Sequence, residues 1–93
     1  MKKRLGSAHL WNTQGETPAE TARLIVRAQL MTQIADIIKA NGWNQTEAAK
    51  HCGTEQPRIN YLLRGRIDRF TLDSLVNLVT ALGRKVRIEI EPL

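Results

Sequence analysis

Apolar residues recur at helical spacing along most of this 93-residue chain and at a spacing of two near its end. The first helical stretch covers residues 18–40, where the apolar positions are Leu24, Ala28, Met31, Ile34, Ala35 and Ile38. Thr17 precedes it as an N-cap, and Asn41-Gly42 follows it as a stop signal. Because this helix is longer than a typical domain helix, we expect its first turns to project beyond the core.

A second pattern, from Gln45 to Leu62, is typical of two short helices joined by a tight turn. Ala49 lets the second helix cross the first closely, and Gly53 can adopt the positive φ that the turn needs. Ile59 and Leu62 are three residues apart, so both face the core. The opposite face is polar and carries Gln56, Arg58, Asn60 and Tyr61. The pattern predicts a DNA-binding helix-turn-helix, with an ordinary pair of packed helices as the alternative.

Local signals predict where these two helices begin. Asn44 is the expected N-cap of a helix over residues 45–51, and Glu47 completes a capping box with it. Pro57 is tolerated only in the first turn of a helix, so it marks the start of the second helix. Trp43 is expected to pack onto the first of these helices as a hydrophobic staple, rather than to bind a ligand or stack on a base.

The pattern after residue 70 predicts one more helix and then a strand. Thr71 is the expected N-cap, Gly83 ends the helix, and its expected buried face consists of Leu72, Leu75, Val76, Leu78, Val79 and Leu82. In residues 84–91 the period changes to two. Val86, Ile88 and Ile90 alternate there with Arg87, Glu89 and Glu91.

This strand has no second strand to pair with elsewhere in the sequence. A lone strand leaves its amides and carbonyls unpaired, so we expect it to pair with another chain. A two-fold dimer joined by an antiparallel ribbon satisfies that need, with Val86, Ile88 and Ile90 as the dimer-strand residues. Strand addition to a different protein and a frayed terminus are the alternatives.

Composition supports one small domain with a polyanionic partner. The chain is 42% hydrophobic and 25% charged, which is normal for a globular protein, and its formal net charge is +5. Residues 41–70, which include the helix-turn-helix, hold five basic and three acidic residues. Residues 1–16 hold three basic and one acidic residue and show no clear period. They are interpreted as a flexible basic arm that contacts phosphates or a protein partner, or as a frayed terminus.

Several classes of function and location find no support in the sequence. The single cysteine, Cys52, rules out an internal disulfide, and no apolar run approaches the ~20 residues that span a bilayer, so we expect a cytoplasmic protein with no membrane partner. Cys52 is expected in the core, and neither His51 beside it nor the distant His9 has metal-ligand spacing. No paired carboxylates, nucleophile–base pair or phosphate loop is present. We therefore expect no enzyme activity, no metal and no cofactor.

The polar face of the second helix suggests how DNA would be contacted. The candidate base-reading residues are Gln56, Arg58, Asn60 and Tyr61. Arginine can fork onto guanine, and glutamine or asparagine can pair with adenine, each pair contributing about 1–3 kcal/mol of discrimination. The candidate phosphate contacts, which would hold register without reading sequence, are Gln45, Arg64, Arg66 and Arg69. For each residue the alternative is a solvated surface side chain.

The segments WNQTEAAKHCGTEQPRINYLLRGRIDRFTLDSLVNLVTALG and RKVRIEIEP resemble Xre-type (lambda-repressor-like) regulators, and more closely the small HigA-like antitoxins. The resemblance covers roughly residues 22–92. It implies a mainly all-α, lambda-repressor-like bundle that dimerises on a palindromic operator in its own promoter. It also implies a partner toxin, a ribosome-dependent RNase of the HigB/RelE type. The chain departs from the pattern at Glu55, where relatives usually have serine or threonine before Gln-Pro.

With the resemblance included, the predicted domain organisation has three parts. Residues 1–16 form the basic arm, residues 17–83 the helical DNA-binding domain, and residues 84–93 the dimerisation strand. The alternative functions are a stand-alone Xre-type regulator without a toxin, and a protein-interaction module on the same fold.

Overall fold

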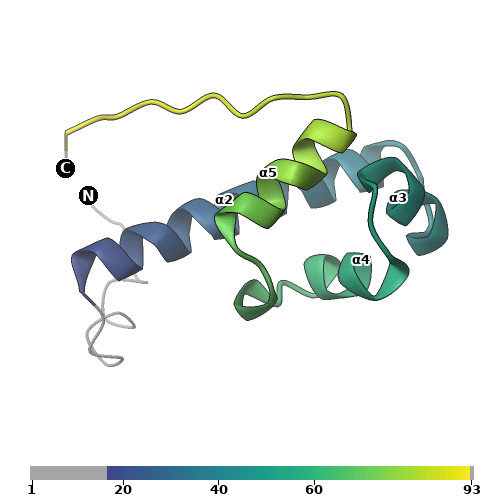
Figure 1. Cartoon of the computed structure of the whole chain (residues 1–93), viewed down its shortest axis with the longest axis horizontal. Helices are drawn as coiled ribbons and strands as arrows, with labels where there is room; N and C mark the ends of the chain where they lie inside the picture. Colours follow the sequence, from purple (N-terminus) through teal and green to yellow (C-terminus); the bar gives the residue numbers. More distant parts are fainter. Residues whose placement is uncertain (1–16, 93) are drawn as a thin grey trace.

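The computed structural model describes residues 17–92, and this part of the chain is mainly helical, as predicted (Figure 1). The elements are α2 (Pro18–Ala40), α3 (Gln45–Cys52), α4 (Gln56–Leu63), the short 3-10 helix η1 (Ile67–Arg69) and α5 (Leu72–Ala81). η1 was not predicted, and the expected loop there is in part this helix. The predicted N-terminal arm lies outside the described residues.

Of the four α-helices within residues 17–92, three begin with a reciprocal capping box. The hydroxyl of Thr17 accepts from the Glu20 amide at 3.1 Å, and the Thr17 amide donates to the Glu20 carboxylate at 2.7 Å. That backbone hydrogen bond holds the pKa of Glu20 below its usual value. Asn44 with Glu47, and Thr71 with Ser74, form the same arrangement. The three predicted N-caps are therefore confirmed.

The helix α4 begins differently. Glu55 occupies its N-cap position but makes no side-chain capping hydrogen bond. Its carbonyl accepts from the amides of Arg58 and Ile59, and Pro57 lies in the first turn, where its missing N–H costs no hydrogen bond. The start of α4 is thus defined by proline and backbone contacts rather than by a side-chain cap.

The core lies where α2, α3, α4 and α5 meet. α5 packs against α2 and α3, and α3 packs against α4 (Figure 1). The buried apolar residues are Met31, Ile34, Ile38, Ala48, Ala49, Cys52, Ile59, Leu62, Phe70, Leu75, Leu78 and Val79. Cys52 is buried among these residues, so its expected core role is confirmed, and this burial raises the pKa of its thiol.

The turn between α3 and α4 depends on Gly53. Its φ is +65°, in the left-handed region, and its amide donates to the Lys50 carbonyl at 3.2 Å. A Cβ at this position would lie 3.4 Å from the Cβ of Ala81, so α5 also packs close to the turn. The predicted role of Gly53 is confirmed, and the turn sets how α4 leaves the core.

One part of the predicted buried face of α5 is wrong. Leu72 and Val76 are 41% and 37% exposed, whereas Leu75, three residues after Leu72 and directly before Val76, is completely buried. Val76 lies on a neighbouring side of α5, whereas Leu72 shares the side of the buried Leu75 and Val79 but is the first residue of the helix, where it borders an open hollow. Val26 of α2 is also exposed, at 45%, and borders the same apolar hollow as Leu72.

The strand predicted for residues 84–93 is not seen in the described part, residues 84–92. This segment is extended, leaves the end of α5 and runs back over α5 toward the N-terminal half of α2 (Figure 1). It forms no strand because no other described segment offers a ladder of backbone partners. Val86 packs against the core, but Ile88 and Ile90 are 77% and 98% exposed.

Candidate nucleic-acid interface

The outward face of α4 is set by its two core residues. Ile59 and Leu62 are buried and face the core. The opposite side of α4 therefore points away from the core. Asn60 and Tyr61 lie on that side and are both half-buried, with Tyr61 also packed against the core, and the exposed Arg64 follows them one turn later as the C-cap. Arg64, predicted as a phosphate contact, therefore continues the side of α4 that carries Asn60 and Tyr61.

Gln45 and three of the predicted base-reading residues line one shallow hollow. Gln45 comes from the first turn of α3, and Gln56, Asn60 and Tyr61 come from α4, with Pro57 completing the surface. The hydroxyl of Thr46 donates to the side-chain oxygen of Gln56 at 3.3 Å, which ties the N-terminal turns of α3 and α4 together. The contribution of Thr46 was not predicted.

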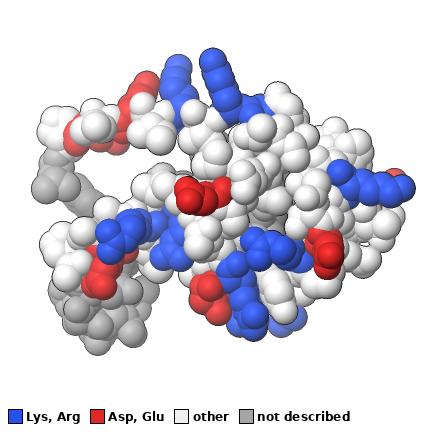
Figure 2. All heavy atoms as spheres, viewed as in Figure 1, with Lys and Arg blue, Asp and Glu red and all other residues white. Residues whose placement is uncertain are grey.

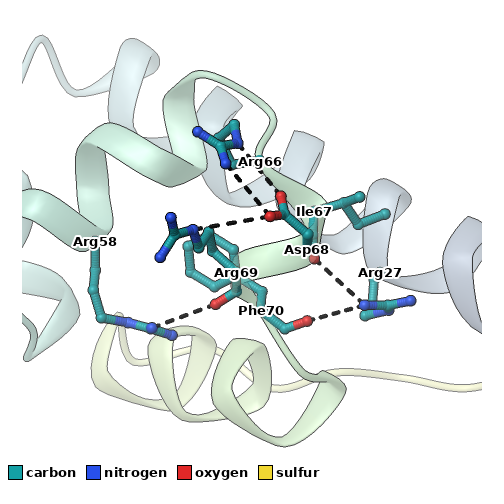
Figure 3. A network of polar contacts seen from close by, with 7 residues as sticks. All are labelled: Arg27, Arg58, Arg66, Ile67, Asp68, Arg69 and Phe70. Carbon is teal, nitrogen blue, oxygen red and sulfur yellow. Dashed lines mark hydrogen bonds and ion pairs between the residues drawn. The ribbon is translucent and has the colours of Figure 1, made fainter.

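The turn after α4 carries two more predicted phosphate contacts, Arg66 and Arg69, and both guanidinium groups lie over the ring of Tyr61. The guanidinium carbons of Arg66 and Arg69 lie 5.9 Å and 4.7 Å from the Tyr61 ring centroid. Arg66 donates two hydrogen bonds to the Asp68 carboxylate, each 3.4 Å long, and Arg69 lies 3.9 Å from it (Figure 3). The hydrogen bonds from Arg66 hold the pKa of Asp68 below its usual value.

Arg58 is placed apart from the other candidate base-reading residues. Its guanidinium carbon lies 4.6 Å from the centroid of the Phe70 ring, and Nη1 donates to the Arg69 carbonyl at 3.4 Å (Figure 3). Arg58 is two residues from both Gln56 and Asn60, so it lies on a different side of α4. In this structure its side chain therefore holds the turn that carries Arg69.

Arg27 of α2 supports the same turn, a role that the sequence pattern did not predict. Its Nη1 donates to the carbonyl oxygens of Ile67 at 3.4 Å and Phe70 at 3.1 Å (Figure 3). Two arginines from different helices thus satisfy carbonyl groups of one short segment. No local spacing could have predicted this contact, because Arg27 and Phe70 are 43 residues apart.

Positive charge gathers beside α4 on the face drawn in Figure 2, with acidic groups interspersed. Among the described residues, Arg66 and Arg69 have an acidic partner in Asp68, whereas Arg58 and Arg64 form no ion pair. Arg64 is exposed, so its charge is available to an anion. The surface therefore combines amide groups, arginines and one tyrosine, which suits a partner carrying both phosphates and base edges.

The described residues show little that would suit other classes of ligand. In residues 17–92 no three His, Cys, Asp or Glu side chains are grouped so as to hold a metal. The rings of Trp43 and His51 stack at 3.9 Å with an interplanar angle of 6°, so Trp43 packs onto α3 as predicted. None of the described helices combines the length and apolar character needed to cross a bilayer.

Comparison with known families agrees with this geometry. A family model described as a helix-turn-helix domain matches residues 15–91, which includes every described element and nearly all of the extended segment. Among curated proteins, none matches the chain.

Proposed function

Because the chain belongs to this helix-turn-helix domain family, we propose that it is a sequence-specific DNA-binding repressor that acts as a dimer on a palindromic operator in its own promoter. Such a repressor acts where the DNA is, which we propose to be the cytoplasm. Within that function we propose the narrower role of the antitoxin of a HigBA-type operon. The match to the helix-turn-helix family supports DNA binding. The resemblance of the sequence to HigA-like antitoxins supports the narrower role.

The single observation that best supports DNA binding is the composition of the α4 surface. Gln45, Gln56, Asn60 and Tyr61 share one hollow, and Arg64 continues the outward face of α4. We propose that Gln56, Asn60 and Tyr61 contact base edges, while Gln45 and Arg64 contact phosphates on either side. Arg66 and Arg69, on the following turn, are proposed phosphate contacts as well.

Arg58 remains a proposed base-reading residue with a second role. In the free protein its guanidinium is occupied by Phe70 and the Arg69 carbonyl. That hydrogen bond is long, at 3.4 Å, so its exchange for a guanine edge would cost little. We propose that Arg58 both positions the turn and contacts DNA.

The proposed dimer sets the geometry of the operator. Two copies related by a two-fold axis place two α4 helices in successive turns of the major groove. Their half-sites would then be about 34 Å, or one helical turn, apart. A palindromic operator follows from the symmetry of the protein.

Two alternatives remain on the same fold. A stand-alone regulator would lack a toxin, and a small basic toxin-like reading frame beside this gene would favour the antitoxin role. A protein-interaction module would present apolar residues on the outward face of α4, whereas this chain presents Gln56, Asn60 and Arg64 there. We therefore favour DNA binding. Catalysis is not proposed, since helix-turn-helix families are typically non-enzymatic.

The decisive experiment is binding to labelled DNA from upstream of the gene, compared with shuffled DNA of the same composition at about 150 mM salt. We expect a preference of about 10³-fold or more for the native fragment, which is in the range of a specific DNA-binding protein. Weak, strongly salt-dependent binding that is equal on both fragments would refute sequence-specific repression, because it would show that only charge is recognised.

Asn60→Ala is expected to weaken operator binding by about tenfold to a hundredfold and leave binding to shuffled DNA nearly unchanged. The reason is that an amide on the outward face of α4 can form a bidentate contact with adenine worth about 1–3 kcal/mol. Asn77→Ala on α5 makes the same chemical change at an exposed site away from the hollow and serves as the matched control. Equal losses for the two variants would remove Asn60 from the interface.

A further inference from the structure

The extended segment after α5 has one apolar and one charged side. Val86 packs against the core, and Ile88 and Ile90 continue that side but are 77% and 98% exposed. Arg87 and Glu89 lie together on the other side, since their side chains form an ion pair of 3.5 Å. The segment therefore has the side-chain alternation of a strand while its backbone lacks a partner strand within the described residues.

The charges of this segment are ordered along its length. Arg84, Lys85 and Arg87 come first, and Glu89 and Glu91 come last. Figure 2 shows the segment along the upper edge, with basic side chains closer to α5 and acidic ones farther from it. A parallel, in-register pair of such segments would put like charges side by side, whereas an antiparallel pair puts opposite charges together.

We infer that this segment pairs antiparallel with the same segment of a second copy of the chain, with Ile88 opposite the partner's Ile88 on the two-fold axis. The inference rests on the dimer proposed above and adds the surface and the register of its interface. In an antiparallel ladder, the position of one pair of opposite residues determines all the other pairs. The remaining pairs are Val86 with Ile90, Arg87 with Glu89, and Lys85 with Glu91.

No other antiparallel register pairs apolar residues with apolar residues on one side of the ribbon and opposite charges on the other side. An axis through Arg87 or Glu89 would place that charged residue opposite its own copy, which is destabilising. An axis through Val86 would place Lys85 opposite Arg87. An axis through Ile90 would place Glu89 opposite the partner's Glu91, and an axis between residues would place every apolar side chain opposite a charged one.

The position of Pro92 agrees with the register centred on Ile88. Pro92 lacks a backbone N–H and would lie opposite Arg84, so that pair must belong to the set without ladder hydrogen bonds. Because the two sets alternate, the Ile88 pair belongs to the same set, and the charged pairs exchange the hydrogen bonds. Side chains approach each other most closely in pairs without ladder hydrogen bonds, which suits the two isoleucines at the axis.

The apolar side of this ribbon would also face the helices. Val86 lies on that side and already packs against the core. Apolar side chains are also exposed on two helices, at Leu72 and Val76 of α5 and Val26 of α2. Apolar side chains that a second copy covers would favour the dimer, because their surface is removed from water.

Variants of the full chain that each add one cysteine to the buried Cys52 test the register. Ile88→Cys should give a disulfide-linked dimer under mild oxidation, because an opposite pair without ladder hydrogen bonds has a Cα separation of about 4.5 Å, within disulfide range. Val86→Cys and Ile90→Cys should each give little cross-linked dimer alone, but an equal mixture of the two should give the cross-linked heterodimer. The unmodified chain is the control, since Cys52 is only 2% exposed.

The outcomes separate this inference from the proposed function. Cross-linking strongest at Arg87→Cys or Glu89→Cys would overturn the register. A chain that remains dimeric in light scattering after deletion of residues 84–93, or that is monomeric throughout, would overturn the ribbon altogether. Operator binding is measured on the same samples. If the protein binds the operator specifically but its extended segments do not cross-link, the inference is wrong and the repressor function stands. If the dimer cross-links but shows no operator preference, the inference stands and the repressor function is wrong.

Discussion

Arg58→Ala is expected to weaken operator binding by at least tenfold to a hundredfold and binding to shuffled DNA by a clearly smaller factor. The larger loss reflects a guanine contact of about 1–3 kcal/mol, which only the operator provides in register. The smaller loss reflects the turn after α4, because Arg58 donates to the Arg69 carbonyl and lies over Phe70. Once that contact is lost, Arg66 and Arg69 are held less firmly beside the DNA backbone.

The measurement is a titration of both DNA fragments at several salt concentrations. Arg23→Ala is the matched control, because it removes the same charge from an exposed position on α2. A loss of the same size on both fragments would show that Arg58 acts only through the turn. No loss beyond that of Arg23→Ala would remove Arg58 from DNA recognition.

Leu75→Ala is expected to lower the free energy of unfolding by about 2–5 kcal/mol. Leu75 is completely buried where α5 meets the core, so truncation leaves a cavity as well as removing apolar burial. Small domains are stable by only about 5–15 kcal/mol, so a large part of the folded-state margin would be lost.

Chemical denaturation at a fixed protein concentration measures the effect. Leu72→Ala on the same helix is the matched control, since Leu72 is 41% exposed and its truncation opens no enclosed cavity. We expect that variant to lose less than half as much. If the two variants were equally destabilised, the packing of α5 described above would be wrong.

Helix boundaries were predictable from the sequence because the interactions that set them are local. A capping box joins residues three apart, as in Thr17 with Glu20 and Asn44 with Glu47. The positive φ of Gly53 is likewise a property of one residue and its neighbours. Apolar periodicity similarly identified the core positions of α4, Ile59 and Leu62.

The predicted site followed from the sequence only in part. Spacing along α4 correctly separated its core side from its polar side, but it could not show that the side chain of Arg58 turns toward Phe70 rather than toward the hollow beside Gln56. Nor could it show that Leu72 and Val76 would be left exposed. Whether a given apolar stripe is buried depends on which helices lie beside it.

The sequence by itself determined where the helices begin and end, which side of α4 is polar, and the alternation of residues 84–91, because each depends on neighbours within a few positions. Only the tertiary structure decided how the arginines are used. Arg58 and Arg27 reach carbonyl groups 11 and 43 residues away, and such contacts depend on how the helices pack. Packing sums many weak, non-directional contacts between segments distant in the chain, so it leaves no short-range signal in the order of the residues.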